Sequence, residues 1–455
     1  MRRSRILFAL ALFTALAGSA NAQRIVVNAD QPVLAGDPIT LQLADLKPGQ
    51  SVLLRAERAV RTFTGSLAVF AGEAAFTADA QGRVDLATQA PLPGSAYAGA
   101  DVRGLLWSMR STTASPEGRP FNRVDLQLRD ASGAELARAE LRLTHALPGV
   151  QTRKAEPFEG ALFAALPGAQ CRPTLILLGG SEGGSAITRD AAHWASHGYA
   201  VLALPYYSPP RWGAFGPLPP ELPGLPLRFF DIPVDRLEAA RDWLAQQPEV
   251  DATRIGVMGT SKGAEFALLA GVEMPWIRAI AAIVPTDVVW EGWGTDADAP
   301  TTGASFAWKG QPYAHVRFHD MAAEWSRVAQ GQQMRLRRPH EEGRAKTSPA
   351  QLAKARIPVE RIRAALLVAG GGDDQLWPSG DMAAAIAATR QQAGLATTAL
   401  VFPEAGHALG GTGTGPTTHY DEGHSALGGT PEATARAQAA THAALRRFFA
   451  ESLGR

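Results

Sequence analysis

The stretch "RIGVMGTSKGAEFALLAG", residues 254–271, has the pattern of a strand, a sharp turn and a helix. "RIGVM" is a mostly apolar run typical of a buried strand, and "AEFALLAG" has the composition of a helix. Between them, Ser261 lies two residues from Gly259 and two from Gly263, and these glycines leave room for a tight strand-to-helix turn. G-x-S-x-G alone is a weak pattern, but in this context it indicates a parallel-sheet domain with Ser261 as a candidate nucleophile.

The alternation of strands and helices continues on both sides of this stretch. From about residue 155 it runs through "PTLILLGG", "DAAHWASHG", "YAVLALPYY", "PVDRLEAARDWLAQQ", "RIGVMG", "AEFALLAG" and "IRAIAAIVP". After residue 359 it resumes with "AALLVAGGG", "DMAAAIAATRQQAG", "TTALVFPEAGH" and "TARAQAATHAALRRFFAESL". This alternation predicts a mostly parallel sheet with helices on both faces, in a domain that covers residues 155–455.

Two other segments have different patterns. Residues 23–150 contain short alternating stretches such as "PITLQLADL", "SVLLRAERAV" and "RVDLQLRD", separated by turns at intervals of about ten residues, which predicts an antiparallel β-sandwich. Between about residues 288 and 359 the regular rhythm lapses into Trp, Gly and Pro and then a charged stretch, "MRLRRPHEEGRAK". We expect a lid-like insertion there, the alternative being a mobile surface excursion.

The N-terminus has the three parts of a secretory signal. Basic "MRRSR" precedes apolar "ILFALALFTALAG", and "SANA" ends in small residues. We therefore predict a signal peptide over residues 1–22, cleaved after Ala22, and an exported protein that is periplasmic or secreted. A buried first helix explains the same apolar run less well, because the arginines crowd one end of it.

Composition excludes several classes of protein. The chain is 46% hydrophobic and 19% charged, and removal of the three signal arginines leaves 41 basic against 43 acidic residues, with no basic stripe to bind nucleic acid. No internal run reaches the roughly 20 apolar residues of a membrane-spanning helix, so the mature chain should contain no stable span. The single cysteine, Cys171, cannot form an internal disulfide.

The remaining parts of a catalytic triad occur in the expected order after Ser261. "LLVAGGGDDQLWPS" follows a buried strand with two aspartates, and "LVFPEAGHALGG" follows the next strand with a histidine. Both turns should lie at the same edge of the sheet as the serine. We assign His407 as general base and then general acid, and Asp374 as the group that orients it; Asp373 is the alternative acid and could instead cap the turn.

The stabilisation of an oxyanion requires two N–H groups that are fixed before the reaction. One should come from Lys262, which follows the nucleophile, and the other from Ser181 or Glu182 in the loop "LLGGSEGGS". This loop is not a dinucleotide or phosphate loop, because G-x-G-x-x-G and G-x-x-x-x-G-K-[ST] are both absent.

Other polar residues are assigned structural roles. Glu265 lies in the first turn of the helix after Ser261, where its charge suits the helix dipole. His193 and His197 belong to an amphipathic helix, and the remaining rivals of His407 lie in a turn-rich loop or in the last helix: His419, His424 and His442. Because H-E-x-x-H and comparable spacings are absent, we predict no metal site and no cofactor.

At the level of motifs, the sequence resembles the acyl-CoA thioester hydrolase and bile acid-CoA:amino acid N-acyltransferase family. The resemblance rests on "GSAYAGADVRGLLWSMR", "LLGGSEGG", "GTSKGAE", "AWKGQPY", "GGGDDQLWPS" and "AGHALGG". It implies an immunoglobulin-like sandwich followed by an α/β-hydrolase domain, with the nucleophile at Ser261, the acid in the Asp373–Asp374 pair and the base at His407. In the family, acyltransferases carry cysteine and hydrolases serine at the nucleophile, so the resemblance implies hydrolysis through an acyl-enzyme.

The expected partner is therefore a small-molecule acyl ester or thioester. Because an exported enzyme would be separated from intracellular CoA, a carboxylesterase or dienelactone-hydrolase-like enzyme that acts on non-CoA esters is the alternative. A non-catalytic binding protein that works through its sandwich domain is a third hypothesis. It is disfavoured because nucleophile, acid, base and glycines all occur together.

Overall fold

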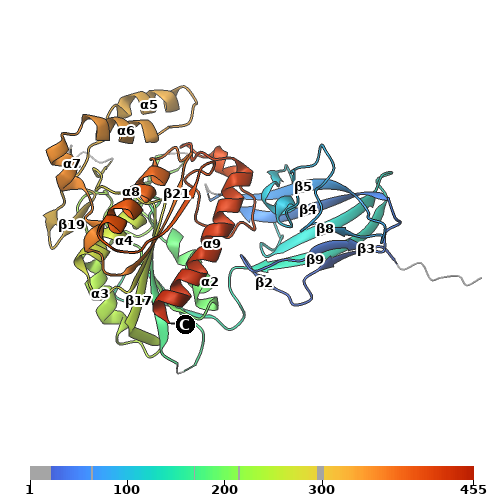
Figure 1. Cartoon of the computed structure of the whole chain (residues 1–455), viewed down its shortest axis with the longest axis horizontal. Helices are drawn as coiled ribbons and strands as arrows, with labels where there is room; N and C mark the ends of the chain where they lie inside the picture. Colours follow the sequence, from blue (N-terminus) through green and yellow to red (C-terminus); the bar gives the residue numbers. More distant parts are fainter. Residues whose placement is uncertain (1–21, 63–64, 169, 214–215, 295–301, 455) are drawn as a thin grey trace, which may run out of the picture.

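The structure is a computed structural model that describes residues 22–62, 65–168, 170–213, 216–294 and 302–454. The predicted signal peptide lies outside the described residues, apart from Ala22. Figure 1 shows a β domain, in blue to cyan, beside a larger α/β domain in green to red. The long C-terminal helix α9 (Pro431–Leu453) runs along the side of the α/β domain that faces the β domain.

The N-terminal domain contains two sheets around one apolar core. The six-stranded sheet has the order β2-β9-β8-β4-β5-β7, with bounds Val33–Leu34, Glu135–Thr144, Arg123–Asp130, Ser51–Arg61, Leu67–Thr77 and Arg110–Ser111. The three-stranded sheet has the order β1-β3-β6, with bounds Arg24–Val27, Leu41–Ala44 and Val84–Asp85. In β4 alternate residues are buried, as the period of a half-buried strand requires: Val52, Leu54 and Ala56. The predicted N-terminal β domain is confirmed.

The second domain is built on an eight-stranded sheet. Its order is β10-β11-β13-β12-β17-β18-β21-β22, with bounds Gln151–Lys154, Leu162–Ala165, Ala200–Ala203, Arg172–Leu178, Val250–Thr260, Ala279–Ile283, Ala365–Gly371 and Thr398–Phe402. The strands from β13 to β22 are parallel, and β10 and β11 extend the sheet antiparallel. This is the predicted α/β-hydrolase fold. The strands β10 and β11 were not expected from the sequence pattern, because they have four residues each and β10 is exposed throughout.

Helices cover both faces of this sheet. Alternate residues of β12 point to opposite faces: Ile176 and Leu178 pack with one set of helices, and Leu175 and Leu177 with the other. The first set is α3 (Arg236–Leu244), α4 (Lys262–Glu273) and α8 (Ser379–Gln392), and the second is α2 (Ala191–Ser196) and α9. The near-continuous apolar runs of the strands follow from burial on both faces.

The segment over residues 288–359 is more regular than its sequence suggested. It contains β19 (Phe306–Trp308), β20 (Gln311–Pro312), α5 (Met321–Ala329), α6 (Arg337–Lys346) and α7 (Pro349–Ala355). The expected lapse of regular structure is wrong for the charged stretch, which forms α6. Its Arg337–Glu341, Arg338–Glu342 and Glu342–Lys346 pairs, at i and i+4, support a helix that has no apolar periodicity. Figure 1 shows α5 and α6 at the top of the α/β domain in this view.

Short elements complete the fold. They are α1 (Gly104–Trp107), β14 (Arg211–Gly213), β15 (Gly216–Leu218), β16 (Ile232–Pro233) and the 3₁₀ helices η1 (Ala186–Asp190), η2 (Val359–Arg361) and η3 (Thr418–Glu422). In the part of the chain that the structure describes, no helix is both long enough and apolar enough to cross a bilayer.

The two domains are joined through α9 and the loop that precedes it. Ala435 of α9 belongs to the apolar core of the β domain, and Arg446 of the same helix pairs with Asp37 at 2.5 Å. In the loop, the backbone N–H of Thr417 donates to the carbonyl of Trp107, and the hydroxyl of Thr418 to that of Met109. The β domain therefore supports the segment that follows His407.

Candidate active site

Ser261 occupies a strained turn between β17 and α4. Its φ of 58° and ψ of −121° lie in a region that residues with a Cβ rarely adopt. The turn is held by its backbone: the N–H of Ser261 donates to Ile283 at 2.9 Å, and its carbonyl accepts from Ala264 at 2.9 Å. The geometry presents the serine side chain above the carboxyl edge of the sheet, as the strand–turn–helix pattern predicted.

The flanking glycines are required for space. A Cβ atom at Gly259 would lie 1.9 Å from the carbonyl oxygen of Gly263, and a Cβ atom at Gly263 would lie 2.3 Å from that of Gly179. Both contacts are with backbone atoms, of α4 and of the loop after β12, which cannot move aside as a flexible side chain could. The G-x-S-x-G spacing thus reflects the close approach of the loop after β12, β17 and α4.

The three predicted triad residues meet at this edge. Nε2 of His407 lies 2.9 Å from Oγ of Ser261, and Nδ1 of His407 lies 2.8 Å from Oδ2 of Asp374. Ser261 follows β17, Asp374 follows β21 and His407 follows β22, and all three residues are buried. The order of hydroxyl, imidazole and carboxylate is the one that lets the imidazole accept the serine proton while the carboxylate stabilises the charged ring.

The structure separates the roles of the two aspartates. Asp374 is fully buried, and it accepts hydrogen bonds from Ser379 Oγ at 2.5 Å and from the backbone N–H of Leu376 at 2.9 Å. Asp373 accepts instead from the backbone N–H of Gly429 at 2.8 Å, so it fastens the turn, as the alternative assignment held. Sequence reasoning missed Ser379, although it lies five residues after Asp374 in the motif "DDQLWPS".

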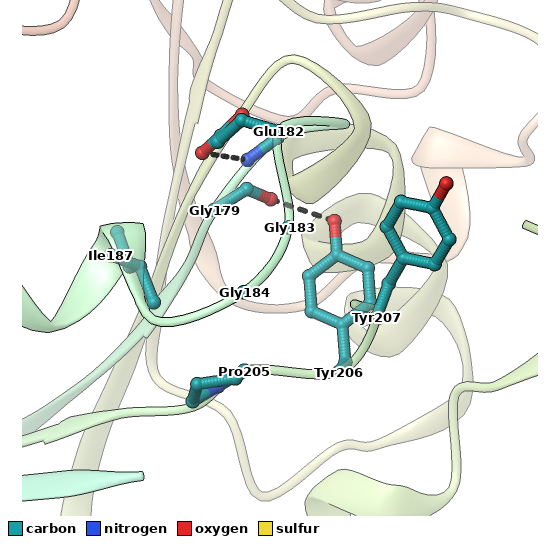
Figure 2. A pocket seen from close by; sticks show the side chains of 9 residues that line it. Gly179, Glu182, Gly183, Gly184, Ile187, Pro205, Tyr206 and Tyr207 are labelled. Atoms are coloured by element: carbon teal, nitrogen blue, oxygen red, sulfur yellow. Dashed lines mark hydrogen bonds between the residues drawn. The ribbon is translucent and has the colours of Figure 1, made fainter. Parts of the chain in front are cut away.

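The loop "LLGGSEGGS" also lies beside Ser261. Ser181 lines the same cleft as Ser261 and Lys262, whereas Glu182 lies on the other side of the loop. Figure 2 shows the Glu182 carboxylate accepting the N–H of Gly180, and the Tyr206 hydroxyl donating to the carbonyl of Gly179, at 2.9 and 2.7 Å. Of the two residues predicted to supply the second oxyanion donor, the placement favours Ser181. The contribution of Tyr206 was not foreseen.

Comparison with known proteins decides the family. Residues 36–155 match the family model described as the acyl-CoA thioester hydrolase/BAAT N-terminal region, and residues 232–455 match its BAAT/acyl-CoA thioester hydrolase C-terminal counterpart. The chain belongs to the acyl-CoA thioester hydrolase/BAAT family. It is therefore an enzyme of this family, and the resemblance seen in its motifs is confirmed.

Relatives of this family member align along most of its length. Acyl-coenzyme A thioesterase 6 of Mus musculus is 30% identical over 445 residues, which cover 92% of this chain and 94% of the relative. Acyl-coenzyme A thioesterase 1 of Homo sapiens is 27% identical over 442 residues, with the same coverage. Among solved structures, a putative dienelactone hydrolase from Klebsiella pneumoniae subsp. pneumoniae has 15% identity and a TM-score of 0.38, covering 66% of this chain and 99% of its own.

A charged pair is buried beside the nucleophile in this hydrolase-family enzyme. Nζ of Lys262 lies 2.5 Å from Oε2 of Glu265 and 2.7 Å from Oγ of Ser305, and both charged side chains are at most 2% exposed. Burial lowers the pKa of Lys262 and raises that of Glu265, while the pairing opposes both shifts. Glu265 is structural, as predicted, but through this ion pair and a bond from the N–H of Trp290.

An apolar cleft opens in front of Ser261. Its volume is about 520 Å³, and residues 288–359 supply much of its wall. The large side chains that line it are Phe230, Trp290, Trp293, Phe318, Met321, Trp325, Met334, Leu336, Leu376 and Trp377. Trp325 on α5 is 61% exposed, which is unusual for tryptophan and places an apolar ring at the rim. The segment thus shapes the mouth of the site, the position expected for a lid.

The five histidines considered as rivals of His407 lie apart from the triad. His419 packs edge-on against Phe70 of the β domain, and His424 is exposed. His193, His197 and His442 come together as a separate group, with ligand atoms within 4.8 Å of one another. The prediction that nothing in the chain resembles a metal site overlooked this group, although His193 and His197 have the i, i+4 spacing that places two rings on one helix face.

Proposed function

We propose that this enzyme hydrolyses acyl thioesters of the acyl-CoA class through an acyl-enzyme on Ser261. The observation that carries the proposal is the hydrogen-bonded series Ser261–His407–Asp374 beside an aromatic cleft, in a member of this family. The names of the aligned relatives, acyl-coenzyme A thioesterases, supply the thioester class.

In the first half of the reaction, Nε2 of His407 accepts the proton of the Ser261 hydroxyl while Oγ attacks the thioester carbonyl carbon. Asp374, bonded to Nδ1, stabilises the imidazolium that forms. The carbonyl oxygen becomes an oxyanion, and the backbone N–H of Lys262 is the first donor available to it, since the first N–H groups of a helix have no intrahelical partner. Ser181 supplies the second N–H. The C–S bond then breaks, and the thiolate takes the proton from His407.

In the second half, water takes the place of the thiol. His407 accepts a proton from water as its oxygen attacks the acyl-serine carbonyl, and returns that proton to Oγ of Ser261 when the ester bond breaks. The products are a carboxylic acid and a free thiol. The serine at position 261 supports hydrolysis over transfer to an amino acid, because the transferases of this family carry cysteine there.

The cleft supports a hydrophobic acyl group as the part of the substrate that is bound. Its wall is mostly Trp, Phe, Met and Leu, and such a surface gains free energy when it covers methylene groups, at roughly 0.8 kcal/mol per buried CH₂. Lys262 and Glu291 are its charged members, and the Lys262 charge is already paired with Glu265. The acyl chain therefore extends from Ser261 between Trp290 and the α5–α6 helices.

We also propose that the chain is exported, on the basis of the signal-like residues 1–22. Export supports the second candidate function, a carboxylesterase that acts on non-CoA esters with the same triad. Mass measurement of the protein recovered from the periplasm or medium tests this proposal: a mature chain that begins at Gln23 supports it, and an unprocessed chain in the cytosol overturns it.

The function is tested with a substrate panel. Purified enzyme is given medium- and long-chain acyl-CoAs and p-nitrophenyl esters, with Ser261→Ala as the blank and Ser51→Ala, an exposed serine of the β domain, as the matched control. We expect acyl-CoA turnover to exceed ester turnover by an order of magnitude, and Ser261→Ala to lose at least about 10⁴-fold. Faster turnover of esters would replace the thioester assignment by the esterase, and full activity of Ser261→Ala would overturn the mechanism.

A further inference from the structure

Three histidines from two helices converge beneath the β domain. His193 lies in α2 and His197 caps its C-terminus, while His442 lies in α9, 249 residues after His193. Each is at most 5% exposed. Nε2 of His193 and Nε2 of His442 are 2.8 Å apart, and one ring nitrogen from each of the three residues lies within 4.8 Å of the others.

We propose that His193, His197 and His442 form a binding site for one divalent transition-metal ion, with Zn²⁺ as the ion that the donor set fits best. Each histidine supplies one imidazole nitrogen, and water completes a four-coordinate site. Nothing in the triad chemistry uses these residues, so the site is structural and holds α2 against α9.

The donor chemistry supports this assignment. His193 and His442 are at most 5% exposed and approach each other through Nε2, so each ring presents a nitrogen to the same point. Imidazole nitrogens suit zinc, copper and nickel, whereas magnesium and calcium require oxygen ligands, and the group contains no carboxylate. In the absence of an ion, one neutral ring can donate from Nε2 to the Nε2 of the other, and a cation would take the place of that proton.

The geometry is close to that of a tetrahedral zinc site. Zn–N distances of about 2.0–2.1 Å place the ligand nitrogens about 3.3 Å apart. The distances in the group, from 2.8 Å to at most 4.8 Å, bracket this value, so binding requires His193 and His442 to separate slightly and the third nitrogen to approach by up to about 1.5 Å, which ring rotation can supply. The i, i+4 spacing already orients His193 and His197 to one side of α2.

The surroundings place the site at the junction of the domains. A Cβ atom at Gly36 would lie 2.5 Å from Cε1 of His442, so the backbone of the β domain rests on that ring. Arg446, four residues after His442 in α9, is paired with Asp37 of the β domain at 2.5 Å, so its charge is compensated. A bound cation would therefore fasten the two helices at the point where the β domain docks.

The test uses the full chain without a polyhistidine tag, dialysed against EDTA. It is titrated with Co²⁺, whose visible absorption reports low-coordinate nitrogen ligation, and then with Zn²⁺ by calorimetry and thermal unfolding. We expect one equivalent of each ion to bind, Zn²⁺ to displace Co²⁺, and the unfolding midpoint to rise by several degrees. His193→Gln and His442→Gln should weaken binding by more than the roughly 10–100-fold that loss of an outer-shell partner costs.

His424→Gln, at an exposed histidine, is the matched control and should bind as the wild type does. If Co²⁺ gives no visible bands and Zn²⁺ no shift in the wild-type chain, the proposal is overturned whether or not the variants fold. Equal binding by wild type and His442→Gln overturns it as well. Because every readout is metal binding or unfolding, failure here leaves the proposed hydrolysis untouched.

Discussion

Two sets of buried histidines in this enzyme have different partners: His407, and the group of His193, His197 and His442. His407 has a carboxylate on one nitrogen and a hydroxyl on the other, Asp374 and Ser261, so a positive charge on its ring is stabilised as it forms. His193 and His442 face each other, with no carboxylate in their group, so their rings stay neutral and present lone pairs. The partners of His407 thus suit the transfer of a proton, whereas those of His193 and His442 suit the binding of a cation that we propose.

The largest expected effect tests the carboxylate on which His407 depends. Asp374→Asn keeps the shape of the side chain but removes the charge that stabilises the imidazolium, so we expect kcat to fall by about 10⁴-fold. Asp373→Asn is the matched control, because Asp373 bonds only to the neighbouring turn. Steady-state kinetics of both variants decides the point. A large loss in Asp373→Asn with little in Asp374→Asn would reverse the assignment.

The next effect concerns the charge buried beside Ser261. Glu265→Gln leaves the Lys262 ammonium buried without its counter-ion, and we expect the free energy of unfolding to fall by about 3–5 kcal/mol. The measurement is denaturant unfolding, with Glu451→Gln, at an exposed glutamate of α9, as control. An unchanged free energy of unfolding would mean that Lys262 is neutral in the folded protein.

A further buried histidine, His340, extends the comparison, because we expect it to make the stability of the protein depend on pH. His340 of α6 is buried against Trp290, Phe318 and Trp377, and burial lowers its pKa from 6.5 to about 4. As the pH falls, His340 therefore takes up a proton in the unfolded chain before it does so in the folded protein. The stability that is present above pH 6.5 is lost as the pH falls towards 4. Between pH 6.5 and 4, we expect His340 to lower the free energy of unfolding by about 1.4 kcal/mol for each pH unit of acidification.

Unfolding of the wild type, His340→Phe and the exposed-site control His424→Phe, measured at several pH values, tests this contribution. The slope should decrease in His340→Phe and stay the same in His424→Phe. Equal slopes in all three proteins would show that the α6 segment does not bury a neutral imidazole in solution.

The smallest expected effect is on the turnover of variants in the group of His193, His197 and His442. His442→Gln should leave kcat/KM close to the wild-type value, because the residue touches neither the cleft nor the triad. His407→Gln, the corresponding change in the other group, should lose at least about 10⁴-fold, as Ser261→Ala does. Parallel kinetics on both variants checks the contrast. A comparable loss in both would mean that the two groups of histidines are energetically coupled.

Much of the active site could be predicted because its determinants are local. Each of Ser261, Asp374 and His407 follows a strand of a parallel sheet, and the carboxyl ends of such strands meet at one edge. Gly259 and Gly263, which flank Ser261, are required by steric contacts that any chain with this turn must satisfy. The convergence of His193 and His197 with His442 has no comparable local signal. Their helices, α2 and α9, are far apart in the sequence, and only the packing of both helices on the same face of the sheet brings the three residues together.

The sequence by itself determined the two-domain architecture, the nucleophile elbow and the order of the triad, because periodicity, glycine spacing and chain order are properties of neighbouring residues. The tertiary structure decided between Asp374, which contacts His407, and the alternative Asp373; it also decided that the Lys262–Glu265 pair is fully buried and that three histidines converge where the domains meet. These outcomes depend on burial and on distances between side chains, which are set by the packing of the whole fold.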